Sequence, residues 1–149
     1  MTHHHSPFSI DLPLSPSLDR LLDYWRGLLR GEATVPFADD LNMAKVEALT
    51  DEAFLLGVFE KPQRFRLDLA HTRQAQQSEA ALTGRFIDEV ELRNPMEFLM
   101  AQASATVESM APSFYEHRPK HAERGYGRLL LPAWGEGHVS LLLGAVEFR

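Results

Sequence analysis

The histidines are the first residues of this sequence that could do chemistry, because imidazole binds metals and transfers protons near neutral pH. His117 and His121 are four residues apart, a spacing that ligates zinc from one face of a helix. Pro119 lies between them in a region typical of strands and turns, so the required helix is not expected. Three consecutive histidines occupy residues 3–5, but adjacent side chains point in different directions and do not form a preorganised set of ligands. We therefore predict no metal site.

Two carboxylates, Asp68 and Asp88, are the remaining candidates for proton transfer. A small cone-shaped α+β enzyme of the ketosteroid-isomerase type would need such a base in an apolar cleft. Asp68 lies on the polar side of a strictly alternating segment, which disfavours that role. The chain has no cysteine, which removes thiol nucleophiles, disulfides and cysteine-ligated zinc. We predict no catalytic residue, and the small enzyme stays as an alternative.

Composition and charge restrict the class of protein further. The formal net charge of −6 over 149 residues argues against a nucleic-acid-binding surface, which would be basic. The longest apolar stretches, residues 129–131 and 141–143, are far shorter than the roughly 20 residues that span a bilayer. The N-terminus has no basic segment followed by an apolar one, so no secretory signal is indicated. With cysteine absent as well, we expect a cytoplasmic protein.

An amphipathic helix is predicted over residues 16–30, after an irregular arm at residues 1–14. Ser15 is a suitable N-cap, Pro16 suits the first turn, and Gly31 is the expected C′ residue. Residues 15–149 are predicted to form one domain that includes this helix. Its apolar stripe is wide enough to contact the chain's own sheet and the same helix of a second subunit. The predicted homodimer contact consists of Leu18, Leu21, Leu22, Trp25 and Leu29.

The remaining elements follow from changes in hydrophobic period. A short helix is predicted over residues 42–49, a buried strand over 53–59 and an alternating strand over 64–69, with a hairpin turn between the strands. A long helix is predicted to begin at Asn94, with Pro95 in its first turn and Glu97 as capping-box partner, and to end before residue 112. Three C-terminal strands are predicted over residues 113–118, 126–134 and 138–148.

Six short segments carry a family resemblance through their order and spacing. They are the Leu-x-x-x-Trp motif at residues 21–25, followed by Gly31, and residues 54–56, 64–67, 82–85, 129–132 and 142–145. In this arrangement residues 18–149 resemble a bacterial subfamily of small PAS proteins. The resemblance implies an α+β fold with a five-stranded antiparallel sheet. Its helices are inserted between strands two and three, and an amphipathic helix precedes it.

This resemblance implies a stand-alone cytoplasmic sensory or regulatory domain in bacterial signalling, which senses a small ligand or docks to a signalling protein in trans. PAS domains with flavin–cysteine chemistry need a thiol, and the predicted long helix lacks the histidine that haem-binding members use, so no cofactor is expected. A small apolar ligand would be lined by Phe65, Leu67, Phe86, Met100, Val107 and Tyr115. These residues could equally fill the core, which would make the domain a pure interaction adaptor.

Overall fold

The computed structural model describes residues 8–10, 14–50, 52–72, 83–120 and 124–149. The chain begins with helix α1 (Pro16–Gly27), a 3₁₀ turn η1 (Ala38–Asp40) and helix α2 (Met43–Leu49). Strands β1 (Glu52–Phe59) and β2 (Arg64–Thr72) precede a 3₁₀ turn η2 (Ile87–Glu89) and helix α4 (Leu99–Ser109). The chain ends with strands β3 (Ser113–His117), β4 (Tyr126–Gly135) and β5 (His138–Phe148). No helix in the described ranges combines the length and apolar character needed to cross a membrane.

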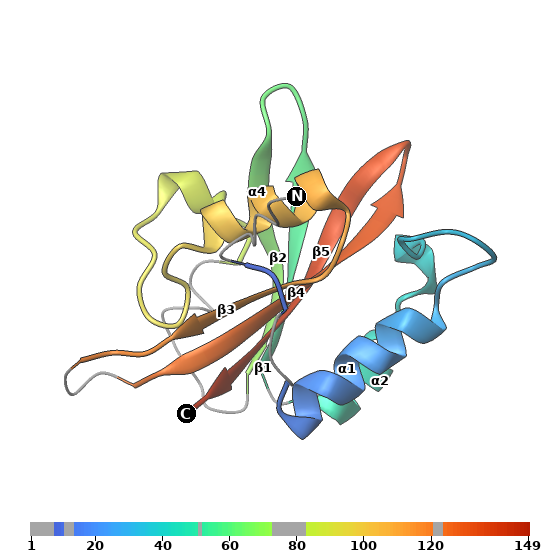
Figure 1. The fold of residues 1–149 in the computed structure, drawn as a ribbon. Coiled ribbons are helices and arrows are strands. Elements are labelled where there is room, and N and C mark those ends of the chain that lie inside the picture. The colour runs from blue at the N-terminus through green and yellow to red at the C-terminus, as the bar shows by residue number, and fades with distance from the viewer. Residues whose placement is uncertain (1–7, 11–13, 51, 73–82, 121–123) are drawn as a thin grey trace, which may run out of the picture.

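The strands form one antiparallel sheet in the order β2-β1-β5-β4-β3 (Figure 1). β1 and β2 form the hairpin that the sequence predicts, and the chain then crosses by way of α4 to β3 at the opposite edge. The C-terminal strand β5 lies in the middle, between β1 and β4. The predicted mixed α+β class with a five-stranded antiparallel sheet is therefore confirmed.

Both faces of the sheet are covered, which explains the continuous apolar run in β4. Successive strand residues point to opposite faces. Tyr126 and Leu130 belong to the cluster that packs with α4, whereas Leu129 and Leu131 belong to the cluster that packs with α1. All four side chains are fully buried. We call these two sides of the sheet the α4 face and the α1 face.

Helix α1 lies on the α1 face through its Leu-x-x-x-Trp motif. Leu21 is fully buried, and Trp25 donates a hydrogen bond from Nε1 to the Pro132 carbonyl oxygen of β4 at 2.8 Å. The helix ends at Gly27 and not at residue 30, because Leu28 N–H bonds to the Trp25 carbonyl in a tighter, 3₁₀-like turn. Gly31 instead lies in the following turn with φ +57°.

The side chains predicted to form a dimer contact are occupied within the chain. Leu18, Leu21, Leu22 and Trp25 are each no more than 3% exposed and pack against the sheet, while Leu29 is half-buried. The chain's own sheet already covers the apolar stripe of α1. The prediction that the stripe needs a second subunit to remove it from water is therefore wrong. Dimerisation itself stays a prediction.

Helix α4 begins later than the capping pattern at residues 94–97 predicts. Its N-cap is Phe98, which has no side-chain capping bond, and Glu97 lies outside the helix, so the predicted capping box is wrong. Asn94 donates from Nδ2 to the Arg124 carbonyl at 2.7 Å, and the Pro95 carbonyl accepts from the Arg128 guanidinium at 3.0 Å. These tertiary bonds tie residues 94–98 to the sheet and delay the helix.

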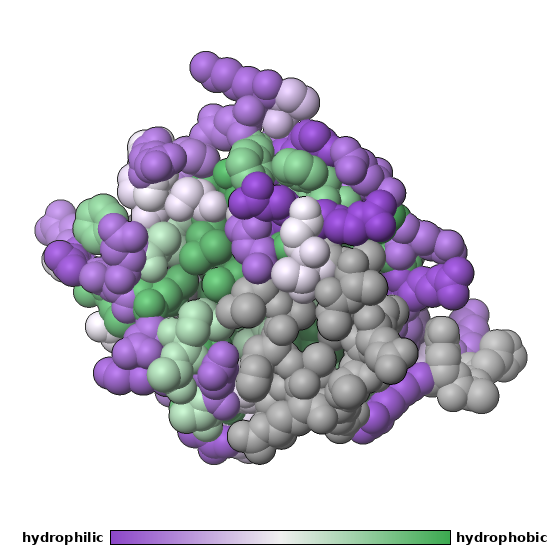
Figure 2. Space-filling model, turned by 180° about the vertical axis from the view of Figure 1, so that it is seen from behind, coloured by the Kyte–Doolittle hydropathy of each residue, from purple (hydrophilic) through white to green (hydrophobic). Residues whose placement is uncertain are grey.

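The space-filling view from behind separates polar and apolar residues (Figure 2). Hydrophilic residues form most of its outline, and hydrophobic residues gather toward its middle. Among the described residues, five large apolar side chains remain exposed: Phe37, Phe59, Phe98, Met100 and Met110.

Candidate functional site

A fully buried arginine lies beneath the first turn of α4. Arg128 of β4 is 0% exposed. Its Nε donates to Gln102 Oε1 at 2.7 Å, and its Nη1 donates to the Pro95 carbonyl at 3.0 Å. The guanidinium is thus held on two sides, by α4 and by the segment that precedes it. Arginine suits this position because its planar fork can bond several partners at once.

Buried polar side chains continue this network between α4 and the edge strand β3. Gln102 donates from Nε2 to Ser113 Oγ at 3.0 Å and to the Arg128 carbonyl at 3.1 Å. Thr106 donates to the Gln102 carbonyl at 2.8 Å and its hydroxyl is hydrogen-bonded to Ser113 at 2.6 Å. Because buried polar groups are costly unless paired, these bonds fix the orientation of α4 on the sheet.

Three buried polar atoms beside this network have no hydrogen-bond partner. They are Nη2 of Arg128, the Tyr126 hydroxyl and Oε1 of Glu97. Within the described ranges, Oε1 of Glu52 is the one other buried side-chain atom without a hydrogen-bond partner. The charges of Glu97 and Arg128 act on each other and on Tyr126 without a direct ion pair, and the Tyr126 hydroxyl interacts with the Arg128 guanidinium without the geometry of a well-formed hydrogen bond. A buried group without a partner needs a physical explanation, such as a bound molecule.

Burial decides the electrostatics of the site. It lowers the pKa of Arg128 to about 10, against the opposing influence of Tyr126, Tyr115 and Glu97. It also raises the pKa of Tyr126 and, by a smaller amount, that of Tyr115. At neutral pH both phenols are therefore neutral hydrogen-bond donors beside a charged guanidinium.

Aromatic rings enclose the guanidinium. Its Cζ lies 5.1 Å from the centroid of the Tyr115 ring and 5.9 Å from that of Tyr126. The Phe98 ring meets Tyr115 edge-on at 5.9 Å between centroids and is 63% exposed. Phe98 has φ +60°, a left-handed conformation that is strained for a bulky residue and is enriched at functional sites. We call Glu97, Phe98, Tyr115, Tyr126 and Arg128 the Arg128 site.

The structure brings together most of the residues predicted to line a ligand pocket. Phe65 and Leu67 are buried in the apolar cluster of the α4 face, and Val107 and Tyr115 pack against it. Tyr115 also lies over the Arg128 guanidinium. Phe86 is half-buried, and Cζ of Arg64 lies 3.9 Å from the centroid of its ring. Met100 is 38% exposed and does not belong to that cluster.

Sequence reasoning missed Arg128, Gln102 and Tyr126. One signal was available for Arg128: it alternates with Tyr126 and Leu130 in a strand whose neighbours are nearly all apolar. A charged residue in such a run either faces solvent or is buried with partners. The partners, Gln102 and Pro95, are distant in sequence, so no local pattern revealed them.

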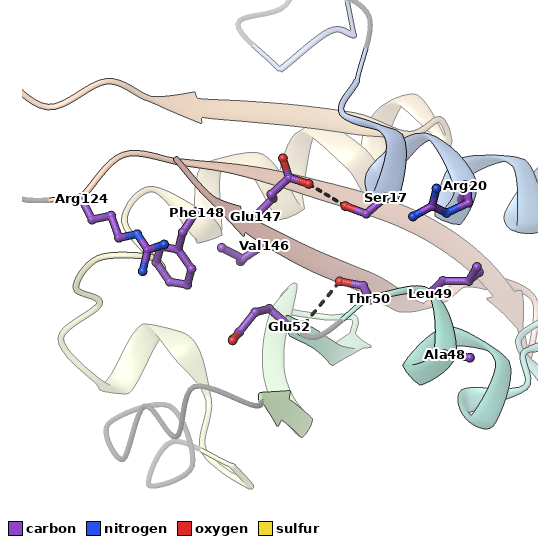
Figure 3. A pocket seen from close by; sticks show the side chains of 10 residues that line it. All are labelled: Ser17, Arg20, Ala48, Leu49, Thr50, Glu52, Arg124, Val146, Glu147 and Phe148. Carbon is purple, nitrogen blue, oxygen red and sulfur yellow. Dashed lines mark hydrogen bonds between the residues drawn. The ribbon is translucent and has the colours of Figure 1, made fainter.

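A separate pocket of about 480 Å³ lies where α1 and α2 meet the sheet (Figure 3). Arg124 and Arg20 lie toward opposite ends of it in this view, and Glu147 points toward Ser17. Glu147 accepts hydrogen bonds from Ser15 and Ser17, and from Arg149 at 2.8 Å. Partial burial would raise the pKa of Glu147, but these bonds outweigh it and the pKa is lowered.

The other candidates for chemistry lie on the surface. Asp68 bonds to Arg66 at 2.6 Å, and Asp88 pairs with Arg64 at 3.2 Å. His138 lies 3.4 Å from a carboxylate oxygen of Glu60, at a groove of about 380 Å³ that Val107 also lines. Residues 121–123 lie outside the described ranges, so the His117–His121 spacing is not described. Across the described ranges no three potential metal ligands gather.

Comparisons with protein-family models, with curated proteins and with solved structures find no match to this chain.

Proposed function

We propose that this domain is a PAS-like sensory or regulatory module that responds to a small ligand held between α4 and the sheet. Two features of the fold support the proposal. The sheet has five antiparallel strands, and α4 is inserted between β2 and β3, as the resemblance implies. A cytoplasmic location and a signalling partner in trans belong to the same proposal, the former because the chain lacks cysteine.

The Arg128 site carries this proposal. A filled core pairs nearly all of its polar atoms, because each unpaired one destabilises the fold, so several unpaired atoms in one place need an explanation. Here a guanidinium nitrogen, a phenol and a carboxylate oxygen are unpaired in one place. A ligand that bonds to them would contact α4, its preceding segment and β4 together. Occupancy would then change how firmly α4 is held, which is a means of passing a state to a docked partner.

The two alternatives from the sequence have less support. A small enzyme needs a base in an apolar cleft, and Asp68 and Asp88 lie in surface ion pairs with Arg66 and Arg64. A pure adaptor agrees with the apolar packing of Phe65 and Leu67, but gives no reason for the unpaired atoms at Arg128.

Native mass spectrometry of freshly purified protein, compared with its denatured mass, tests the proposal. We expect a non-covalent mass that is lost on denaturation. Hydrogen exchange with and without that ligand should show added protection in α4 and β4, with β2 as an internal control. If no ligand co-purifies and no small molecule changes exchange in α4, the adaptor becomes the better account.

A further inference from the structure

We infer that the Arg128 site binds a small carboxylate that also carries a hydrogen-bond donor next to the carboxylate, as a 2-hydroxy or 2-amino acid does. The inference rests on the proposed function and names its ligand class. It follows from the hydrogen-bond donors and the acceptor among the unpaired atoms, and from the charges of Arg128 and Glu97.

The donors select an anionic oxygen. Arg128 is already held through Nε and Nη1, so Nη2 has a fixed orientation and makes no well-formed hydrogen bond. The Tyr126 hydroxyl adds a second donor beside it, because its own contact with the guanidinium lacks the geometry of a well-formed hydrogen bond. A carboxylate offers two acceptor oxygens to such a pair, and charge-assisted bonds to arginine are among the strongest in proteins. Preorganised donors lose little entropy on binding, which favours a small ligand.

The position of α4 adds to the preference for an anion. Gln102, to which Arg128 bonds, lies in the first turn of α4, and no side chain caps this end of the helix. The N-terminal end of a helix carries a partial positive charge. An anion at Arg128 Nη2 would lie close to this end.

The unpaired acceptor, Oε1 of Glu97, indicates that the ligand also carries a hydrogen-bond donor. Oε1 of Glu97 is buried and unpaired, and the Glu97 charge acts on Arg128, Tyr115 and Tyr126. Any carboxylate would place a second negative charge near Glu97, and a plain carboxylate would also leave Oε1 of Glu97 without a donor. A hydroxyl or ammonium group on the adjacent carbon would instead donate to Glu97.

Phe98 and Tyr115 mark the solvent side of the Arg128 site, since Phe98 is exposed and Tyr115 is half-buried. Tyr115 lies over the guanidinium, and the exposed Phe98 packs edge-on against Tyr115 from the solvent side. Because Phe98 holds a strained left-handed backbone immediately before α4, a modest change of that backbone would move its ring. Such a movement would change how Phe98 packs against Tyr115 on the solvent side of Arg128.

A matched set of three-carbon probes tests the ligand class. Thermal shift and calorimetry would compare lactate, alanine, propionate and alaninamide at equal ionic strength. We expect lactate and alanine to stabilise the protein, propionate to bind about tenfold more weakly, and alaninamide, which lacks the carboxylate, to have no effect. Failure of every carboxylate to raise the melting temperature would overturn the inference.

Tyr126→Phe separates binding from folding. The substitution removes an unpaired buried hydroxyl, so the melting temperature of the ligand-free protein should stay the same or rise. Affinity for lactate and alanine should fall about tenfold, the loss of one good hydrogen bond. Tyr24→Phe is the matched control, since the Tyr24 hydroxyl accepts from Asn42 N–H near α2. It should leave affinity unchanged.

Glu97→Gln tests the acceptor. The amide still accepts a hydrogen bond but has no charge, so affinity for alanine should fall more than affinity for lactate. Equal binding of both probes by the parent, Tyr126→Phe and Glu97→Gln would contradict the assignment. A co-purified ligand whose binding ignores both substitutions would also contradict it, but would leave the proposed sensory function intact.

Discussion

Arg128 joins β4 to α4 and to the segment directly before α4, both of which are distant from it in the chain. Its side chain bonds to Pro95 before α4 and to Gln102 within α4, while its backbone belongs to β4. Placing a guanidinium in the interior is unfavourable unless its hydrogen bonds are made. Two of its nitrogens meet that condition and the third does not. The same residue thus positions α4 and leaves one donor for a ligand.

Gly144 shows how closely single residues are packed in the middle of the sheet. It lies opposite Phe54 of β1, and an added Cβ would be 2.1 Å from the tip of the Phe54 ring. Phe54 is 2% exposed and belongs to the core cluster of the α4 face, so its ring cannot turn out into solvent. Gly144→Ala should therefore reduce the free energy of unfolding by about 3 kcal/mol through overpacking. Denaturant titration followed by circular dichroism measures this change.

Gly27→Ala is the control for that substitution. Gly27 ends α1, and a Cβ added there would meet no atom within 4 Å. Alanine there should be neutral or slightly stabilising, because it favours the helical conformation. Similar unfolding free energies for the two variants would show that Phe54 does not restrict Gly144.

At the scale of elements, α1 is attached to β5 by a carboxylate as well as by its apolar stripe. Ser15 and Ser17, at the start of the helix, both donate to Glu147. The pKa of Glu147 is lowered from its ordinary value of 4.5. A carboxyl with a lowered pKa in the folded state stabilises the fold above its ordinary pKa, and this stability is lost as the pH falls through the lowered value.

Glu147→Gln should therefore be less stable than the parent at pH 7, and the difference should shrink as the pH falls below 4.5. Urea titrations between pH 7 and roughly pH 3 would measure the free energy of unfolding of both proteins. Glu91→Gln is the control, because Glu91 pairs with Arg93 on the exposed surface. A constant difference between Glu147→Gln and the parent at every pH would contradict the role of the charge.

At the scale of the whole molecule, the sheet is enclosed by α4 on one face and by α1 on the other (Figure 1). Leu22 is 3% exposed beneath α1, so Leu22→Asp would place a charge in the interior. We expect it to destabilise the monomer by several kcal/mol, on the order of the cost of an unpaired buried ion. Thermal melts with light scattering would separate unfolding from dissociation.

Arg26→Asp is the exposed counterpart on the same helix, since the Arg26 side chain is 60% exposed. It should leave the melting temperature nearly unchanged. A Leu22→Asp protein that stays folded and passes from dimer to monomer would instead restore the interface predicted from the sequence. If the parent forms a dimer whose interface does not include this stripe, the interface lies on another surface.

The sequence by itself determined the local elements. Helical spacing at residues 18–25, strict alternation at 64–67 and the punctuation of the C-terminal strands were sufficient, because each pattern depends on neighbours along the chain. The α+β class and the β1–β2 hairpin followed from the order of these patterns. The apolar stripe of α1 was predicted as well, but the pattern did not reveal which surface covers it.

Only the tertiary structure decided what meets across the sheet. Helix α4 begins later than its sequence pattern predicts because Asn94 and Pro95 bond to residues 124 and 128. Such bonds outweigh a local capping preference of about 1 kcal/mol. The Arg128 site likewise combines residues of three segments that become neighbours only after β4 inserts between β3 and β5. Burial, and with it the unpaired state of these polar atoms, depends on those long-range contacts.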